Sequence, residues 1–436
     1  MRISSELKNF SKYVTLNIIG MIGLSCYILA DTFFIAKGLG SKGLTALNLA
    51  LPLFSLLNGI GLMLGIGGAS RYTVLKNQGD AEGANSVFTH TVFFGAVFSV
   101  IFFCLGCFIP KQLAVLVGAD SEMLGMTGTY ISVLWMFSPF FIFNDIMQSF
   151  IRNDNSPHLS MAGMIIGSMS NIVLDYIFIF PLNMGIFGAI LATGISPCIS
   201  LAVISFHFIK RKNTFHLTPT SANAGHIKYI FSGGLTAFVG EMSTGIVIMI
   251  FNTILLQLSG NIAVAGYGVI ANISMVVISV FNGLAQGIQP LCSRFYGTGN
   301  RNSLQKILHY AIVLSFIIAV LIYLSAFFGA DYITMIFNSD NDAELQKIAV
   351  HGIKLYFIGS VFAGINITVA IYFVSVEQPL FANIISISRG FAVIIPVTII
   401  LSSLWKITGL WLAFTVAEGI VTVLSYILYI TYKRKN

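Results

Sequence analysis

Twelve long apolar runs are the feature that most constrains what this chain can fold into. Each run is long enough to cross the hydrocarbon core of a bilayer as an α-helix, which takes about 20 residues. The runs are continuous rather than alternating, which excludes a membrane β-barrel. Only 9% of the 436 residues are charged, against about 25% in a typical soluble domain. The sequence therefore predicts an all-α polytopic membrane protein.

The predicted spans cover residues 13–36, 44–70, 87–109, 124–150, 159–181, 185–209, 228–257, 262–290, 305–329, 346–374, 381–403 and 408–431. An even number of spans places both termini on one side of the membrane. The segments on that side hold sixteen Lys and Arg residues and the opposite segments hold five. Because positive residues collect on the cytoplasmic side, we expect a multi-pass protein of the plasma (inner) membrane with both termini in the cytoplasm.

The two halves of the chain resemble each other. "NGIGLMLGIGGASRY" (58–72) ends the second span, and "NGLAQGIQPLCSRFY" (282–296) ends the eighth, at an offset of about 220 residues. A long basic loop lies between the sixth and seventh spans. Because each half holds an even number of spans, the repeats are parallel and are related by an axis along the membrane normal. This predicts two six-helix bundles, residues 1–212 and 213–436, around a central cavity.

Acidic residues inside the predicted spans need a reason, since one at mid-bilayer costs at least about 2.5–3.5 kcal/mol. At a rise of about 1.5 Å per residue, Asp31, Asp175 and Thr193 lie at one depth in the outer half of the first bundle. Asn171 lies one turn deeper on the face of Asp175. These groups can share a proton or offer oxygens to Na⁺. The alternative is a hydrogen-bonded cluster that only locks three helices together.

The second half provides an internal control for this hypothesis. At the repeat offset, Asn252 stands where the first half has Asp31, and Val397 stands near the place of Asp175. The acids are absent there although the scaffold remains. If carboxylates were needed to hold the fold, both halves would need them, so their presence in one half favours a function.

Other charged residues in the spans are less specific. Glu241 lies near mid-membrane in the seventh span, which belongs to the second lobe. From that lobe its carboxylate could contact a cationic substrate or a proton. Asp145 lies near the cytoplasmic end of the fourth span and is expected to make an interfacial or gating contact. Arg152 is expected to be an anchor that reaches the interface. Glu418 in the last span has no clear role.

No enzyme signature is present in a suitable context, and no P-loop is found. We therefore expect neither an enzyme nor a cofactor, and transport energy would come from an ion gradient. The dispersed positive residues do not indicate nucleic-acid binding. The 37 Phe and 15 Met residues could supply soft walls for cationic or lipophilic small molecules. We expect the chain to act as a monomer.

Several motifs resemble the multidrug and toxic compound extrusion (MATE) family over essentially the whole chain. They are "ADTFFIAKGLGSKGLTALNLALP" at the first two spans, "QSFIRNDNSPHLSMAG" after the fourth, and "NIVLDYIFIFPLNMGIFGAILATGIS" over the fifth and sixth. The last is similar to a family pattern in which Asn and Asp on helix 5 join Thr on helix 6 and Asp on helix 1. The resemblance implies a cation site of Asp31, Asn171, Asp175 and Thr193.

The resemblance also implies a V-shaped cavity between two bundles and export of organic cations by Na⁺ or H⁺ antiport. Glu241 matches an acid that many relatives carry on helix 7. Some relatives bend helix 1 at a proline, which this chain lacks, whereas Gly20 and Gly23 permit a bend.

Two other functions remain open at this point. A flippase for lipid-linked oligosaccharides would need a strongly cationic cavity, and Arg389 is the main positive residue inside a span. A membrane receptor or assembly scaffold that transports nothing would not need acids at matched depth. Dye efflux would distinguish an exporter from both.

Overall fold

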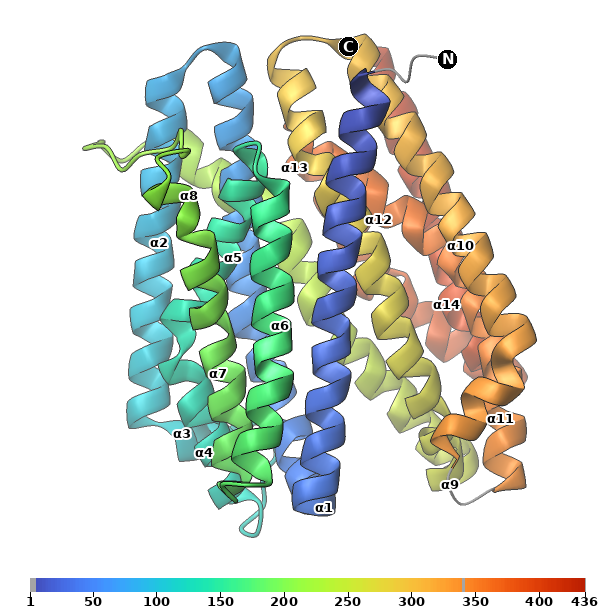
Figure 1. Cartoon of the computed structure of the whole chain (residues 1–436). Helices are drawn as coiled ribbons and strands as arrows, with labels where there is room; N and C mark the ends of the chain where they lie inside the picture. Colours follow the sequence, from blue (N-terminus) through green and yellow to red (C-terminus); the bar gives the residue numbers. More distant parts are fainter. Residues whose placement is uncertain (1–4, 339–341, 436) are drawn as a thin grey trace. The chain divides into compact units, whose positions relative to one another are not determined.

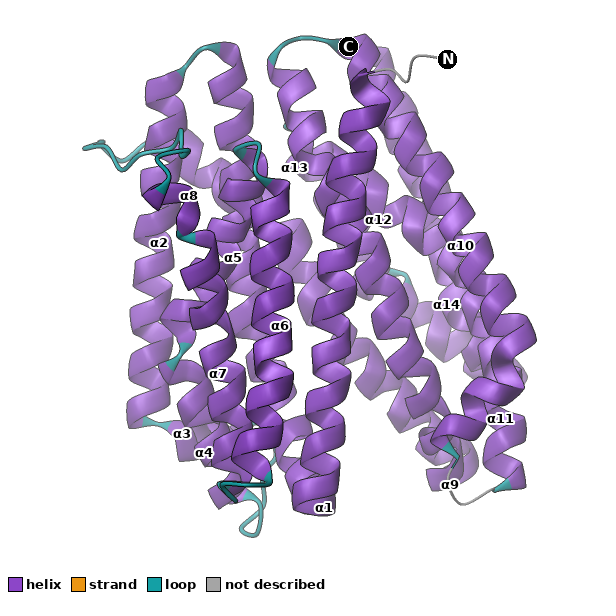
Figure 2. Cartoon of the chain, viewed as in Figure 1, coloured by secondary structure: helices purple, strands orange, loops and turns teal. Residues whose placement is uncertain are grey.

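The computed structural model describes residues 5–338 and 342–435. Throughout these ranges the regular elements are helices joined by short loops (Figure 2). The helices are α1 (Ser5–Gln78), α2 (Ala81–Phe108), α3 (Pro110–Leu116), α4 (Leu124–Met136), α5 (Ser138–Asn153), α6 (Pro157–Ile179), α7 (Gly185–Ile204), α8 (Phe206–Ile209), α9 (Ala224–Gly297), α10 (Arg301–Phe337), α11 (Ala343–Tyr356), η1 (Phe357–Gly359), α12 (Ser360–Ser375), α13 (Pro379–Ile387), η2 (Ser388–Ala392) and α14 (Ile394–Lys435).

The two longest helices are each broken at a glycine. α1 and α9 have 74 residues each, which would extend about 110 Å as straight helices, far beyond a hydrocarbon core of about 30 Å. Gly40 has φ 66° and ψ −156°, and Gly260 has φ 70° and ψ −161°. Only glycine adopts this backbone conformation readily. Each of these helices therefore contributes two spans.

The described part of the chain contains the twelve predicted spans. Nine helical stretches are long and apolar enough to cross a membrane, and α4 with α5 forms a tenth that is bent by 49°. Two of these stretches, α1 and Pro379–Arg434, each hold two spans, because they are broken at Gly40 and at Lys406 (φ 52°). The prediction of an all-α polytopic fold is confirmed.

The repeat is visible in the backbone. Positive φ angles occur in pairs about 220 residues apart: 61° at Asn155 and 57° at Glu377, and 89° at Gly79 and 69° at Gly299. Each pair lies in a turn between helices, so the two halves of the chain turn at equivalent places. The shared turn chemistry explains why the similarity could be recognised in the sequence.

The chain forms two compact units that do not follow the sequence order. The first unit contains Ile19–Met242 and Ser293–Asn300, and the second contains the residues up to Ile18, Ser243–Cys292 and the chain from Arg301 onward. Three of the boundaries lie inside α1 and α9 and one lies between α9 and α10, and none lies in the loop between the sixth and seventh spans. The division into lobes 1–212 and 213–436 therefore stays a prediction.

Each unit has its own buried core of large side chains. In the first unit α6 and α7 pack along each other (Figure 1), and Trp135 and Tyr72 are fully buried. In the second unit Trp411 and Tyr267 are fully buried and stack with ring centroids 6.0 Å apart. Many large apolar side chains of the spans stay exposed, such as Phe328 at 74%, which is expected of a surface that faces lipid.

The linker between α8 and α9, residues 210–223, is held against the first unit. The backbone N–H of Thr218 donates to the Thr89 hydroxyl at 3.1 Å, and that of His216 donates to Asn85 Oδ1 at 3.0 Å. Phe215 is 1% exposed and packs its ring 4.7 Å from that of Phe88. The basic loop of the sequence is therefore a fixed part of this unit.

Candidate cation site

Four polar residues on three helices of the first unit come together in its interior. Asp31 lies on α1, Asn171 and Asp175 lie on α6, and Thr193 lies on α7. Their exposed fractions are 7%, 0%, 0% and 4%. Because α6 and α7 are joined by a short turn in which Asn183 has a φ of 48°, they return along each other and place these residues side by side. The structure brings together all four residues that the sequence selected.

The amide of Asn171 connects Asp175 to α7. With its nitrogen toward the carboxylate, it donates to Asp175 Oδ2 at 3.0 Å and its oxygen accepts from the Thr193 N–H at 3.3 Å. This orientation gives both the amide nitrogen and the amide oxygen a hydrogen-bond partner. The Thr193 hydroxyl donates to the Ala189 carbonyl at 3.2 Å. Asn171 therefore fixes the position of the Asp175 carboxylate.

The two carboxyl groups of the site meet each other. The side chains of Asp31 and Asp175 lie within hydrogen-bonding reach. Each also has one buried oxygen, Oδ1, without a hydrogen-bond partner. Two ionised carboxylates in contact repel each other, and a hydrogen bond between them needs a shared proton. The arrangement is therefore suited to bind a proton or a small hard cation such as Na⁺.

Close packing around the site holds α1 against α6. The ring of Phe34 meets that of Phe180 edge to face at 6.0 Å. Gly38 passes so close to α6 that a Cβ would lie 2.3 Å from Ile179 Cγ2. Asp31 is thereby kept beside Asp175 by apolar contacts on the turns that follow it.

Two tyrosines that the sequence analysis did not select also face the acids. Tyr130 of α4 is 3% exposed and interacts electrostatically with Asp31 and Asp175. Tyr27, one turn before Asp31, interacts with both of these acids and also with Asp145 and Glu241. The spacing of Tyr27 from Asp31 was the only signal in the sequence, and Tyr130 stands in an apolar run without one.

Glu241 belongs to the first unit but not to the four-residue cluster. Its side chain accepts a hydrogen bond from Asn58 of α1, and its charge interacts with that of Asp145 on α5. A Cβ at Gly59 would lie 3.6 Å from Glu241 Cβ, so the helices are close there. Glu241 and Asp145 form a second acidic group, which is connected to the first through Tyr27.

The prediction that Arg152 reaches the membrane interface is wrong. Arg152 is 2% exposed, lies 3.5 Å from the Ser149 hydroxyl and interacts electrostatically with Asp145. The Arg152 side chain is buried inside the unit, which its sequence position near a helix end could not reveal.

A separate charged cluster lies beyond the spans, at the turn between α5 and α6. Asp154 is 4% exposed and accepts from Lys76 Nζ at 2.9 Å, from the Thr214 N–H at 2.8 Å and from His207 Nε2 at 2.9 Å. Burial raises the pKa of Asp154, but the hydrogen bonds from His207, Thr214 and Lys76 outweigh it and hold that pKa well below its usual range. The cluster ties the linker to α1 and α5.

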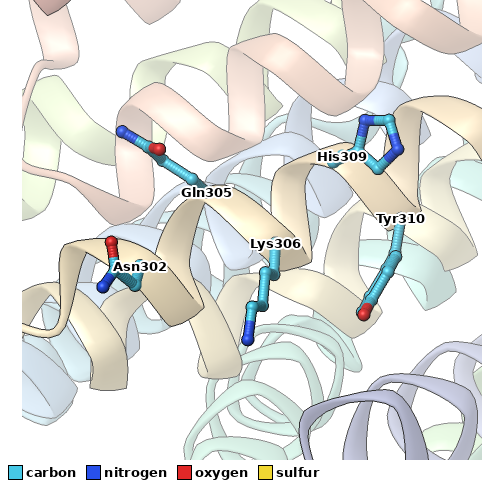
Figure 3. A pocket seen from close by; sticks show the side chains of 5 residues that line it. All are labelled: Asn302, Gln305, Lys306, His309 and Tyr310. Carbon is cyan, nitrogen blue, oxygen red and sulfur yellow. The ribbon is translucent and has the colours of Figure 1, made fainter. Parts of the chain in front are cut away.

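A groove along one face of α10, with a volume of about 390 Å³, is lined by Asn302, Gln305, Lys306, His309 and Tyr310 (Figure 3). The groove contains no residue of the predicted site. Among the described residues no group of three or more His, Cys, Asp or Glu could hold a metal ion. The paired carboxyl groups of Asp31 and Asp175 therefore remain the main candidate for binding a cation.

Twelve helical spans with a pair of carboxyl groups buried among them define a polytopic membrane protein. The family model described as MatE matches residues 17–177 and 237–400. The chain therefore belongs to this family of transporters, which are not enzymes.

Curated relatives and solved structures agree with the family. The chain is 27% identical over 429 residues to the multidrug export protein MepA of Staphylococcus saprophyticus, with 98% of this chain and 94% of that protein covered. It is 25% identical to MepA of Staphylococcus aureus, with 94% and 90% covered. A crystal structure of a MATE protein in complex with MaL6 has the same fold, with a TM-score of 0.93, 23% identity and coverage of 99% and 98%.

Proposed function

We propose that this protein is a secondary active transporter that exports small cationic or lipophilic organic compounds in exchange for Na⁺ or H⁺. The observation that carries the proposal is the contact between Asp31 and Asp175, both buried and each with an oxygen that lacks a partner. Relatives named as multidrug export proteins along almost the whole chain support the direction and the class of substrate.

The coupling ion would act by neutralising the acid pair. When Asp31 and Asp175 are both ionised, their repulsion favours a conformation in which they separate or meet water. A proton or Na⁺ between them removes that repulsion and favours the arrangement in which the two carboxyl groups meet. A ligand shifts a conformational equilibrium only by its difference in affinity for the two states, and a buried pair of acids supplies such a difference. Asn171 and Thr193 would orient the site.

Dye efflux from cells that express the protein tests the proposal. Asp31→Asn and Asp175→Asn are expected to lose efflux while expression and melting temperature stay near wild type, since each change removes a charge and keeps the shape. Glu82→Gln, which alters an exposed acid at the start of α2, is the matched control and should pump normally. If both Asn variants export dye at the wild-type rate against a gradient, the acid pair is not the coupling site.

Proteoliposomes with separately imposed Na⁺ and H⁺ gradients identify the ion. The gradient that drives uptake or release of dye in the wild type should fail to do so in Asp175→Asn. A protein whose expression changes the composition of the envelope but not the retention of dye would be a flippase, and one that changes neither would be a receptor or scaffold.

We also propose that the protein acts as a monomer in the plasma membrane with both termini in the cytoplasm. The excess of positive residues in the segments that include the termini supports this orientation, and the bacterial relatives support the membrane. Protease access to a tag at the C-terminus, compared between intact cells and inverted vesicles, measures the orientation.

A further inference from the structure

A buried ion pair crosses the interior of the second unit. Arg389, in the π-helical turn η2, donates from Nε to both carboxylate oxygens of Glu418 at 3.0 Å and from Nη2 to Oε1 at 2.8 Å. The side chains are 18% and 5% exposed. Such two-pronged pairs are among the strongest charge-assisted hydrogen bonds, and charged groups inside spans are functional by default.

An amide completes the surroundings of the carboxylate. Asn366 of α12 is fully buried and donates from Nδ2 to Glu418 Oε2 at 2.7 Å, while its Oδ1 accepts from the Ser425 hydroxyl at 3.1 Å. Both oxygens of Glu418 thus have donors. The candidate cation site of the first unit differs in this respect, because Asp31 and Asp175 each keep one oxygen without a partner.

The equivalent level of the first unit carries no charge. At the repeat offset of about 220 residues, Arg389 corresponds to Gly167 and Glu418 to Ser196. The Ser196 hydroxyl donates to the Gly167 carbonyl at 2.8 Å, and a Cβ on Gly167 would lie 3.2 Å from Ser200 Cβ. The first unit therefore has neither room nor charge for a residue such as arginine.

This level is one helical turn away from the cation site. Asn171 follows Gly167 on α6, and Thr193 precedes Ser196 on α7, each at a spacing of one turn. Glu418 of the second unit is therefore a carboxylate with an amide partner. Its position in the repeat is one turn from the positions that hold the acid pair in the first unit. The cation beside it is a guanidinium that belongs to the chain.

The π-helical turn explains how Arg389 fits. At Ser388–Ala392 the helix widens, and the Val393 N–H donates to the Ser388 carbonyl at 3.0 Å. The corresponding part of α6 is regular α-helix from Pro157 to Ile179. Turns of this kind are rare and often mark functional sites. The wider turn gives the Arg389 side chain the space that Gly167 lacks.

We propose that Arg389 is a built-in cation that permanently fills a latent cation site, formed by Glu418 and Asn366, in the second unit. Replacing Arg389 by a small neutral residue would vacate this site and leave a buried carboxylate that binds a free cation of guanidinium shape. In the wild type the site is always filled, so only the acids of the first unit exchange their cation. This consequence for coupling rests on the proposed antiport function, whereas the binding of a free cation does not.

Thermal unfolding of the purified full-length protein tests the latent site. The experiment uses an Asp175→Asn background, so that the first unit contributes no acid pair. Adding Arg389→Ala should lower the melting temperature, because breaking a buried pair leaves an uncompensated charge. Guanidinium chloride at low millimolar concentration should then restore at least half of the loss in a saturable manner, and choline chloride at equal concentration should not. Asp175→Asn alone should not respond to either salt.

The matched control removes the acid as well. Arg389→Ala with Glu418→Gln, in the same background, should melt above the Arg389→Ala variant and should be insensitive to guanidinium, since neither charge is then buried alone. This variant also keeps the proposal testable if Arg389→Ala alone does not fold. An equal guanidinium effect in both variants, no effect in Arg389→Ala, or a control that fails to regain stability would overturn the proposal. None of these outcomes depends on whether the protein exports dye.

Discussion

Gly234→Ala is a sharp test of how the first unit is held together. Two helices of this unit, α1 and α9, cross where Gly67 and Gly234 face each other. A Cβ on Gly234 would lie 1.9 Å from the Met63 carbonyl oxygen, and one on Gly67 would lie 2.0 Å from that of Ile230. Ordinary contact begins at 3.4 Å. Each alanine would therefore have to move the two backbones about 1.5 Å farther from each other, because the clash is with backbone atoms and no side chain can move aside.

The magnitude follows from two opposing terms. Alanine favours a helix over glycine by about 1 kcal/mol, while overpacking typically costs about 1–3 kcal/mol and occasionally more. Because the clash is with backbone, we expect the upper part of that range and a net loss of about 1–2 kcal/mol. Gly240→Ala is the matched control. It lies on the same helix with nothing within 4 Å of its Cβ, so it should be neutral or stabilising by up to about 1 kcal/mol.

The assay is thermal unfolding in detergent, followed by dye efflux for variants that fold. Parting the helices would also draw Glu241 away from Asn58, whose side chains are hydrogen-bonded across the same pair of helices. Gly234→Ala should therefore lose both stability and transport, and Gly240→Ala should keep both. Equal melting temperatures for Gly234→Ala and wild type would refute the close crossing. An equal fall in melting temperature for Gly234→Ala and Gly240→Ala would refute it as well.

Two further predictions concern charges in the first unit. Asp154→Asn should lower stability by about 2–4 kcal/mol, since the buried carboxylate loses charge-assisted hydrogen bonds. Because the pKa of Asp154 is lowered in the folded state, its contribution is complete above the ordinary carboxyl pKa of about 4 and is lost as the pH falls below it. The difference in free energy of unfolding between the wild type and Asp154→Asn should thus be constant from pH 8 to about pH 5 and shrink only at lower pH. A decline of this difference between pH 8 and pH 6 would contradict the prediction. Glu241→Gln should raise the KM for monovalent cationic dyes by about 10-fold, the effect of about 1.4 kcal/mol, with little change for neutral substrates. An equal change in KM for cationic and neutral substrates would argue against a contact between Glu241 and the positive group of the dye.

Continuous apolar runs were sufficient to predict the spans, and matching motifs at the ends of two spans predicted the repeat, because both follow from local composition and turn chemistry. Counting depth along the helices brought Asp31, Asn171, Asp175 and Thr193 to one region, and the family pattern guided the choice of Thr193. Their role as cation ligands stays a prediction. The sequence could not show that Arg152 is buried, because burial at the end of a helix depends on how other segments pack against it.

Other features depend on contacts between segments far apart in the chain. The charge of Asp154 is balanced by Lys76 and by the linker residue Thr214, and no local pattern joins these three. Most boundaries of the two units lie inside α1 and α9, where no loop marks them in the sequence. Tyr130 has no polar neighbour in sequence that would distinguish it from other aromatic residues of the spans.

The difference between the two repeats gives a physical reason for the single exchangeable site that we propose. Two copies of one bundle start with the same site. If both copies kept an exchangeable acid, each would bind an ion, and ion binding could not act on one lobe alone. In the first unit the carboxyl groups of Asp31 and Asp175 meet each other and have unpartnered oxygens, so under the proposed antiport their charge would depend on a diffusible ion. In the second unit Glu418 meets Arg389, so its charge is balanced by the chain itself. Occupancy can then change in one unit only, and a conformational equilibrium responds to a ligand only where affinity differs between states. The second unit thus lacks acids at the positions of Asp31 and Asp175, and one turn away it holds a carboxylate whose cation is attached to the chain.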